Sequence, residues 1–322
     1  MRLLAGLLLV LVAASACTGA PPDRRSQVAD LTARIRAMPG VVHADNTFDD
    51  DVAHGPAYFE IDVDVADAVT ADQVAALTKV YLDDLQAQDY PGYAAALDVR
   101  RGESVFAVNA GTRPVANRDQ VMAQARSWVA LHQQFGGSTV ELRAAVNTAP
   151  SSVTLQLPDT ADYAAVPAAV GKLASAFRDL AAGDVTVSAG RQHPAEIQTS
   201  RRLPSPQEID LWNALNTDQS IPHADVFTIN AAGTAPLWVS ERIAADDVDT
   251  AVRLAQQHLP IVATQPLRPI VYTAGNQYRG HIGFQHEATA PVMVTIGGCT
   301  ARKYRPSPAE QALIDRYENC RR

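Results

Sequence analysis

The sequence lacks the short motifs that carry most hydrolytic, nucleotide-dependent and zinc-dependent chemistry. It contains no Gly-x-Ser-x-Gly elbow, no phosphate-binding loop, no dinucleotide glycine fingerprint and no His-Glu-x-x-His metal helix. We therefore expect no catalytic residue, no cofactor and no metal ion, and the sequence favours a noncatalytic protein. An enzyme with a site assembled from residues distant in sequence is the alternative.

Lysine is scarce, and the chain carries a net charge of −8. There are only three lysines, at positions 79, 172 and 303, and the paired arginines are scattered along the chain. Nucleic-acid binding depends on clustered lysine and arginine that displace the counterions of phosphates. The sequence thus excludes nucleic acid as the expected partner.

No apolar run is long enough to span a bilayer, which takes about 20 apolar residues in a helix. The longest run, residues 3–14, follows the single basic residue Arg2 and precedes the small residues Ser15 and Ala16. A basic start, a short apolar middle and small residues before the cleavage site are typical of a secretory signal peptide. We predict that residues 1–16 are removed, which changes the net charge from −8 to −9 because Arg2 is their only charged residue.

The four residues Ala14-Ser15-Ala16-Cys17 resemble the lipobox of bacterial lipoproteins. This resemblance covers only the beginning of the chain. It implies cleavage before Cys17, acylation of the Cys17 thiol, and anchoring at the extracytoplasmic face of the cell membrane. The bias towards arginine and alanine over lysine is typical of a high-GC genome and suggests an actinobacterial source. The alternative is an ordinary secreted protein in which Cys17 has no role.

The two remaining cysteines, Cys299 and Cys320, are predicted to form a disulfide. An exported protein folds in an oxidising compartment, where an even number of cysteines favours pairing. A loop of about 22 residues closed in this way stabilises a fold by roughly 3 kcal/mol in the chain-entropy model.

The rest of the chain is predicted to be an α+β repeat. Helical patterns begin near residues 27, 117 and 205, at intervals of 90 and 88 residues, with second helices near 70, 162 and 244. Strand-like alternation such as AYFEIDVDV lies between them. We predict tandem ferredoxin-like (βαββαβ-type) units with antiparallel sheets and helices on one face. The expected segments are a lipidated tether at 17–26, units at 27–103, 104–190 and 191–275, and a ββα extension at 276–322.

Three helix starts have the residues of a capping box. Thr70, Ser205 and Ser307 each precede, by three residues, a glutamine or glutamate that can accept a hydrogen bond from the cap backbone. Two of the helices also have proline at their first position. Trp128 and Trp212 lie within predicted helices, where packing in the core is expected.

A polar binding surface is expected near Tyr278, Arg279, His281 and His286. His281 and His286 do not predict a metal site, because on a strand a separation of five residues places them on opposite faces. The other histidines are scattered singly without a cysteine or carboxylate at ligand spacing. They are His43, His54, His132, His193, His223 and His258.

Taken together, these features predict a membrane-anchored cell-envelope lipoprotein that acts as a noncatalytic binding or scaffold protein. Its expected partners are the membrane, through lipidated Cys17, and an envelope protein, cell-wall polymer or lipid. The alternatives are an anchored hydrolase and a carrier of a lipid or small apolar ligand, the latter requiring a large internal apolar cavity.

Overall fold

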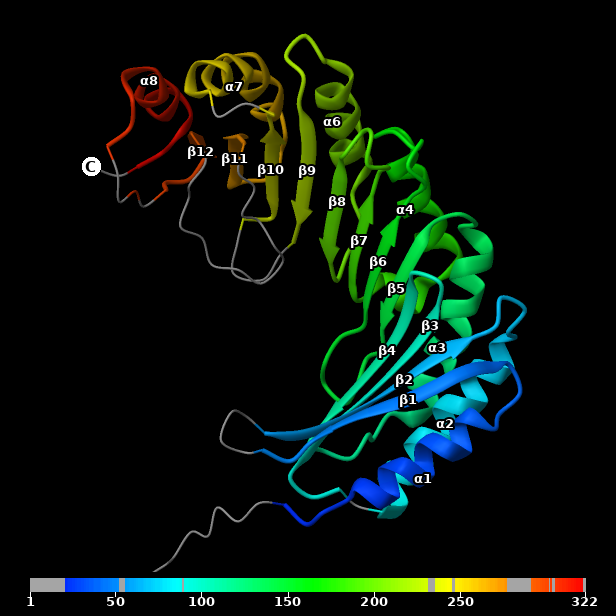
Figure 1. Ribbon diagram of the computed structural model, residues 1–322. Coiled ribbons are helices and arrows are strands. Elements are labelled where there is room, and N and C mark those ends of the chain that lie inside the picture. Colours follow the sequence, from blue (N-terminus) through cyan, green and yellow to red (C-terminus); the bar gives the residue numbers. More distant parts are fainter. Residues whose placement is uncertain are drawn as a thin grey trace, which may run out of the picture.

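The computed structural model describes residues 21–51, 56–88, 90–230, 235–244, 247–276, 291–300, 302 and 305–320. Within them, twelve strands form a single mixed sheet in which the strand order follows the sequence order. The sheet curves along its length, and the helices follow one another along its outer side (Figure 1).

The strands are β1 (Val41–Asp49), β2 (Ala57–Val65), β3 (Tyr93–Arg101), β4 (Ser104–Gly111), β5 (Thr139–Arg143), β6 (Ser152–Gln156), β7 (Asp184–Ser188), β8 (Glu196–Ser200), β9 (Ala224–Ile229), β10 (Leu237–Arg242), β11 (Ile270–Gly275) and β12 (Val292–Ile296). The helices are α1 (Arg25–Arg36), α2 (Ala71–Gln88), α3 (Arg118–Gln134), α4 (Ala165–Ala176), α5 (Arg178–Ala181), α6 (Pro206–Thr217), α7 (Val248–Val262) and α8 (Pro308–Tyr317).

The repeating unit is one helix followed by two strands. The two strands within a unit pair antiparallel, and the last strand of each unit pairs in parallel with the first strand of the next. Successive units are 41 to 47 residues long, since their first helices begin at residues 25, 71, 118, 165, 206 and 248. The predicted interval of about 90 residues therefore covers two units.

The coarse prediction of a mixed α and β fold is confirmed, whereas the tandem ferredoxin-like arrangement is not. In a split β-α-β unit another strand lies between the two parallel strands. Here β2 pairs directly with β3, on either side of α2, and Phe59 lies opposite Ala95. The sheet is also mixed and continuous, not a set of antiparallel sheets. The expected unit boundaries at 103/104 and 190/191 fall between strands that pair with each other.

Alternation along the strands separates the helix-covered face of the sheet from the opposite face. In β2, Phe59, Ile61 and Val63 are fully buried and belong to the main hydrophobic core, while Tyr58 and Asp64, which flank this run and point to the opposite face, are exposed. This is the pattern that burial of one sheet face produces. From β9 to β12 nearly every strand residue is buried, so there the sheet is covered on both faces.

In all three predicted capping boxes the cap hydroxyl accepts a hydrogen bond from the backbone N–H three residues later. The Ser205 hydroxyl accepts from the Glu208 backbone N–H, and the Glu208 carboxylate accepts from the Ser205 N–H. Thr70 and Gln73 make the same reciprocal pair, and the Ser307 hydroxyl caps α8 by accepting from the Glu310 N–H.

The stability of the fold depends on pH through Glu208. Burial alone would raise the pKa of Glu208, but hydrogen bonds from Arg202 and from the Ser205 backbone outweigh burial and lower it. Because the pKa is lower in the folded state, Glu208 stabilises the fold above the ordinary glutamate range, and this contribution is lost as pH falls through the folded value.

We therefore expect Glu208→Gln to lower the thermal midpoint at neutral pH and to lose this effect below about pH 4. Thermal unfolding followed by circular dichroism across pH measures the difference between the two proteins. Asp210→Asn, at an exposed position on the same helix, is the matched control. A Glu208→Gln effect that is the same at every pH would contradict this account.

Within the described part of the chain, no helix combines the length and apolar character needed to cross a membrane.

Candidate functional site

The residues singled out in the sequence lie in different parts of the chain. Cys299 and Cys320 form the predicted disulfide, with a sulfur–sulfur distance of 1.97 Å. Cys17 lies outside the described residues. The expected binding residues also lie outside them: Tyr278, Arg279, His281 and His286.

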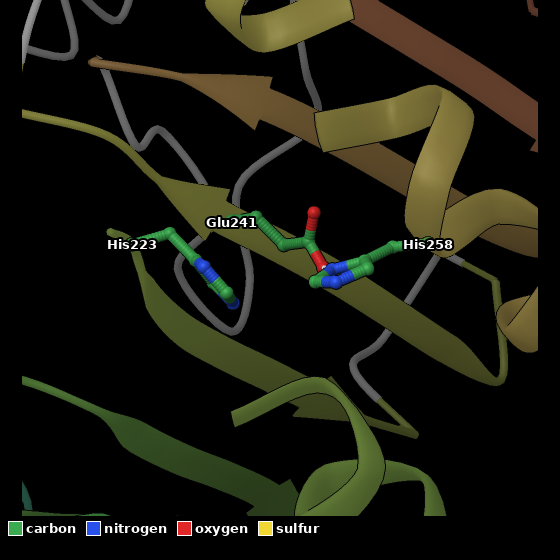
Figure 2. Close-up of side chains that lie close together, drawn as sticks. All are labelled: His223, Glu241 and His258. Atoms are coloured by element: carbon green, nitrogen blue, oxygen red, sulfur yellow. The ribbon is translucent and has the colours of Figure 1, made fainter. Parts of the chain in front are cut away.

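A buried cluster of histidine and carboxylate side chains lies between the C-terminal strands and α7. His223 precedes β9, Glu241 lies on β10 and His258 lies on α7. Figure 2 shows their three side chains converging from these separate elements. Potential ligand atoms of the three residues all lie within 4.8 Å of one another. All three side chains have zero exposure to solvent.

Strand register brings a second carboxylate to this cluster. Asp225 on β9 lies directly opposite Glu241 on β10. Alternate residues of a strand point to the same face, so Asp225 points with Phe227 and Ile229 to the helix-covered face of the sheet. Its side chain is fully buried there. Burial raises the pKa of Asp225 well above its ordinary value, and the nearby Glu241 carboxylate raises it further.

The Glu241 carboxylate is held at both oxygens. His258 Nδ1 lies 2.5 Å from Glu241 Oε1, and the Tyr272 hydroxyl donates to Glu241 Oε2. Burial of His258 would lower its pKa, but its interactions with Glu241 and with Asp218, whose Oδ2 lies 3.4 Å from His258 Nε2, outweigh burial and raise the pKa. Contacts with Glu241 and Asp218 at its two ring nitrogens thus hold the His258 ring in one orientation.

His223 is held by its other ring nitrogen. Its Nδ1 lies 2.7 Å from the Ile221 carbonyl oxygen, which can only accept, so Nδ1 carries the hydrogen. Nε2 points into the buried cluster, 3.8 Å from Asp225 Oδ1. Neither Nε2 of His223 nor either carboxylate oxygen of Asp225 has a hydrogen-bond partner among the described residues. Buried polar groups without hydrogen-bond partners cost free energy, so this cluster lowers the stability of the folded protein.

The side of the sheet opposite the helices carries a second polar region. Glu60 and Asp62 on β2 and Asp98 on β3 group together, and Arg100 Nη2 lies 2.7 Å from Asp62 Oδ1. Burial raises the pKa of Asp98; Arg100 opposes this shift and Asp62 adds to it. Burial also raises the pKa of Glu60, and repulsion from Asp98 and Asp62 raises it further. Arg143 on β5 is 70% exposed on the same side.

Farther along the sheet, a pocket of about 150 Å³ opens beside the ends of β6 to β8. Polar side chains contribute much of its lining, among them Gln156, Ser188, Glu196 and Arg242. The Ser188 hydroxyl donates to Glu196 Oε2 over 2.7 Å. The pocket is small and its lining is mixed, because Ala189, Pro194 and Val226 lie beside these polar side chains.

Comparison with known proteins finds no match. No protein-family model matches the chain, no curated protein matches its sequence, and no solved structure matches its fold. The site must therefore be interpreted from its own geometry.

His223 and His258, which are scattered singly in the sequence, lie together in the fold. The two rings lie 5.1 Å apart between centroids and share Glu241 as a neighbour. The separation in sequence hides this, because the three residues belong to two strand regions and a helix. The detectable signal was a charged residue at a core position of a strand, Asp225 in ADVFTI and Glu241 in LWVSER.

Proposed function

We propose that the protein is a membrane-anchored lipoprotein of the cell envelope that binds a partner without catalysing a reaction. The lipobox ending at Cys17 supports the anchor, and an acylated cysteine would place the folded part at the extracytoplasmic face. Two acyl chains hold a protein far more firmly than one, since each buried methylene contributes about 0.8 kcal/mol. The Cys299–Cys320 disulfide agrees with an oxidising compartment.

The observation that carries the binding role is the side of the sheet opposite the helices. Polar and charged side chains extend from adjacent strands on this side, including Asp62, Asp98, Arg143 and Thr154. Repeated units that stack into one curved sheet offer an extended surface of this kind for a large partner. The partner class is an envelope protein, a cell-wall polymer or a lipid.

The anchor is tested by the intact mass of the protein extracted from its native membrane, with and without reduction. We expect a chain that begins at Cys17, carries acyl chains and gains the mass of two hydrogen atoms on reduction. Cys17→Ser should release the protein from the membrane fraction. An unmodified Cys17 in the membrane-extracted protein would overturn the anchor.

The binding role is tested with the Cys17→Ser protein and isolated cell envelopes. Arg143→Glu changes the charge of the proposed surface and should reduce the envelope-bound fraction. Arg178→Glu, at an exposed position on the helix side, is the matched control and should bind as the parent does. Equal binding by all three proteins would place the contact elsewhere. Genuine turnover of generic ester, peptide or glycan substrates would favour the hydrolase instead.

A further inference from the structure

The buried cluster between β9, β10 and α7 has the composition and the spacing of a metal centre. We propose that His223, Glu241 and His258, with Asp225 beside them, bind a divalent transition-metal ion of the zinc class. The inference stands on the convergence of these side chains (Figure 2) and on the unpartnered polar atoms among them. It does not depend on the proposed anchor or on the binding surface of the sheet.

The donor atoms select the class of metal. Calcium and magnesium take oxygen ligands, whereas imidazole nitrogens combined with carboxylates suit zinc and its neighbours. Zinc is bound at about 2.0–2.2 Å by histidine and carboxylate, so tetrahedral ligand atoms lie roughly 3.3 Å apart. Donor atoms of His223, Glu241 and His258 already lie within 4.8 Å of one another. Shortening these separations to the tetrahedral value takes side-chain shifts of at most about 1.5 Å.

The surrounding contacts resemble those that orient metal ligands. Histidines that bind a metal usually donate their other ring N–H to an oxygen, which fixes the tautomer. His223 does this through Nδ1 and the Ile221 carbonyl, so its Nε2 lone pair faces the cluster. The Tyr272 hydroxyl in turn holds Glu241 Oε2. Both contacts position donor atoms before any ion arrives.

Two acidic side chains are buried together in the cluster, an arrangement that a bound cation would stabilise. Asp225 and Glu241 are cross-strand neighbours with fully buried side chains, and both oxygens of Asp225 lack a hydrogen-bond partner in the described structure. Buried carboxylates persist in proteins when they are paired or when they coordinate a metal. A divalent ion beside Glu241 would give the Asp225 carboxylate and His223 Nε2 the partner that both lack.

Asp218 offers a route from the surface to the cluster. Its side chain is 32% exposed, and its Oδ2 lies 3.4 Å from His258 Nε2. The Ser220 backbone N–H donates to Asp218 Oδ1 over 3.2 Å, which holds the carboxylate in this position. A carboxylate at this position attracts a cation to the loop between α6 and β9, directly beside the buried site.

The first test measures metal binding by the protein with its disulfide intact. The Cys17→Ser protein removes a thiol that could bind zinc on its own. After treatment with a chelator and dialysis, zinc is added and the bound metal and thermal midpoint are measured. We expect one zinc per chain, a higher midpoint that EDTA reverses, and visible absorption typical of tetrahedral Co²⁺ when cobalt replaces zinc. Neither retained metal nor a shift in the midpoint would overturn the proposal.

Variants locate the ion. His258→Gln should abolish stoichiometric zinc binding, while His43→Gln, at an exposed position on β1, should leave it unchanged. Tyr272→Phe keeps every ligand and should weaken zinc affinity by about 10–100-fold, so it tests the site even if His258→Gln does not fold. Zinc binding of unchanged affinity in both His258→Gln and Tyr272→Phe would place the ion elsewhere and overturn the proposal.

Asp225→Asn distinguishes a metal centre from a stabilising polar network. We expect this variant to raise the thermal midpoint of the chelator-treated protein, because it removes a buried acid without a partner. In the same protein the stabilisation by zinc should shrink, because one negative charge beside the ion is lost. A lower midpoint without metal, together with an unchanged response to zinc, would contradict this role.

Discussion

Trp212→Ala is expected to lower the free energy of unfolding by about 3–5 kcal/mol. Trp212 lies on α6 with no exposed surface, and its ring packs edge-on against Phe227 of β9 at 5.2 Å between centroids. Its indole N–H donates to the Tyr163 carbonyl just before α4, over 3.1 Å. The substitution therefore leaves a large cavity and removes a hydrogen bond that joins neighbouring repeats.

The loss of stability in Trp212→Ala should be largest in the strands near Trp212 and smaller farther along the sheet. Packing contacts in this fold run mainly between neighbouring elements, as expected when each repeat touches only the next. Amide hydrogen exchange should show protection falling most in β8 to β10 and least in β2 and β3.

Chemical denaturation measures the free energy of unfolding, and two further variants serve as controls for Trp212→Ala. Trp212→Phe keeps an aromatic ring and should cost only about 1–3 kcal/mol, since it chiefly loses the donor. Tyr58→Ala, at a position 38% exposed on β2, should stay within about 0.5 kcal/mol of the parent. A cost for Trp212→Ala no larger than that of Tyr58→Ala would show that the ring does not support the core.

Local features of this fold could be predicted from sequence because short-range chemistry determines them. The alternation of Phe59, Ile61 and Val63 with polar residues specifies which face of β2 is buried, and the Ser205 capping box marks the first turn of α6. The order of strands across the sheet has no such local signal. A helix between two strands is compatible with adjacent parallel pairing or with a split arrangement, and only the hydrogen bonds between β2 and β3 decide it.

The candidate site shows the same division. A charged residue in phase with core residues could be detected from sequence, as with Asp225 beside Phe227 and Ile229. That Asp225 lies opposite Glu241 depends on the register of β9 and β10, which the sequence does not state. His258 then joins them because α7, which packs against the neighbouring β11 and β12, carries its ring beside Glu241.

Arg302→Ala is expected to cost about 3–5 kcal/mol, because it leaves a buried carboxylate without its countercharge. Glu318 is 1% exposed, and its two oxygens accept from Arg302 Nη1 and Nη2 at 2.9 and 2.5 Å. Arg302 Nη2 also donates to the Met293 carbonyl of β12 over 2.7 Å. The Glu318 carboxylate further accepts from the Thr295 backbone N–H, so this ion pair joins β12 to the segment after α8.

A double-mutant cycle measures how much of the cost of Arg302→Ala comes from the loss of its interaction with Glu318. Burial would raise the pKa of Glu318, but the hydrogen bond from Arg302 helps to outweigh it and lower the pKa, so at neutral pH Arg302→Ala strands a charged group. Glu318→Gln removes that charge, and Arg302→Ala should then cost much less in the Glu318→Gln background. The measurement is urea unfolding of the four proteins with the Cys299–Cys320 disulfide intact. Equal costs of Arg302→Ala in both backgrounds would show that the two side chains act independently, and the C-terminal helix would then be held to the sheet by the disulfide and by packing of Leu313 and Ile314.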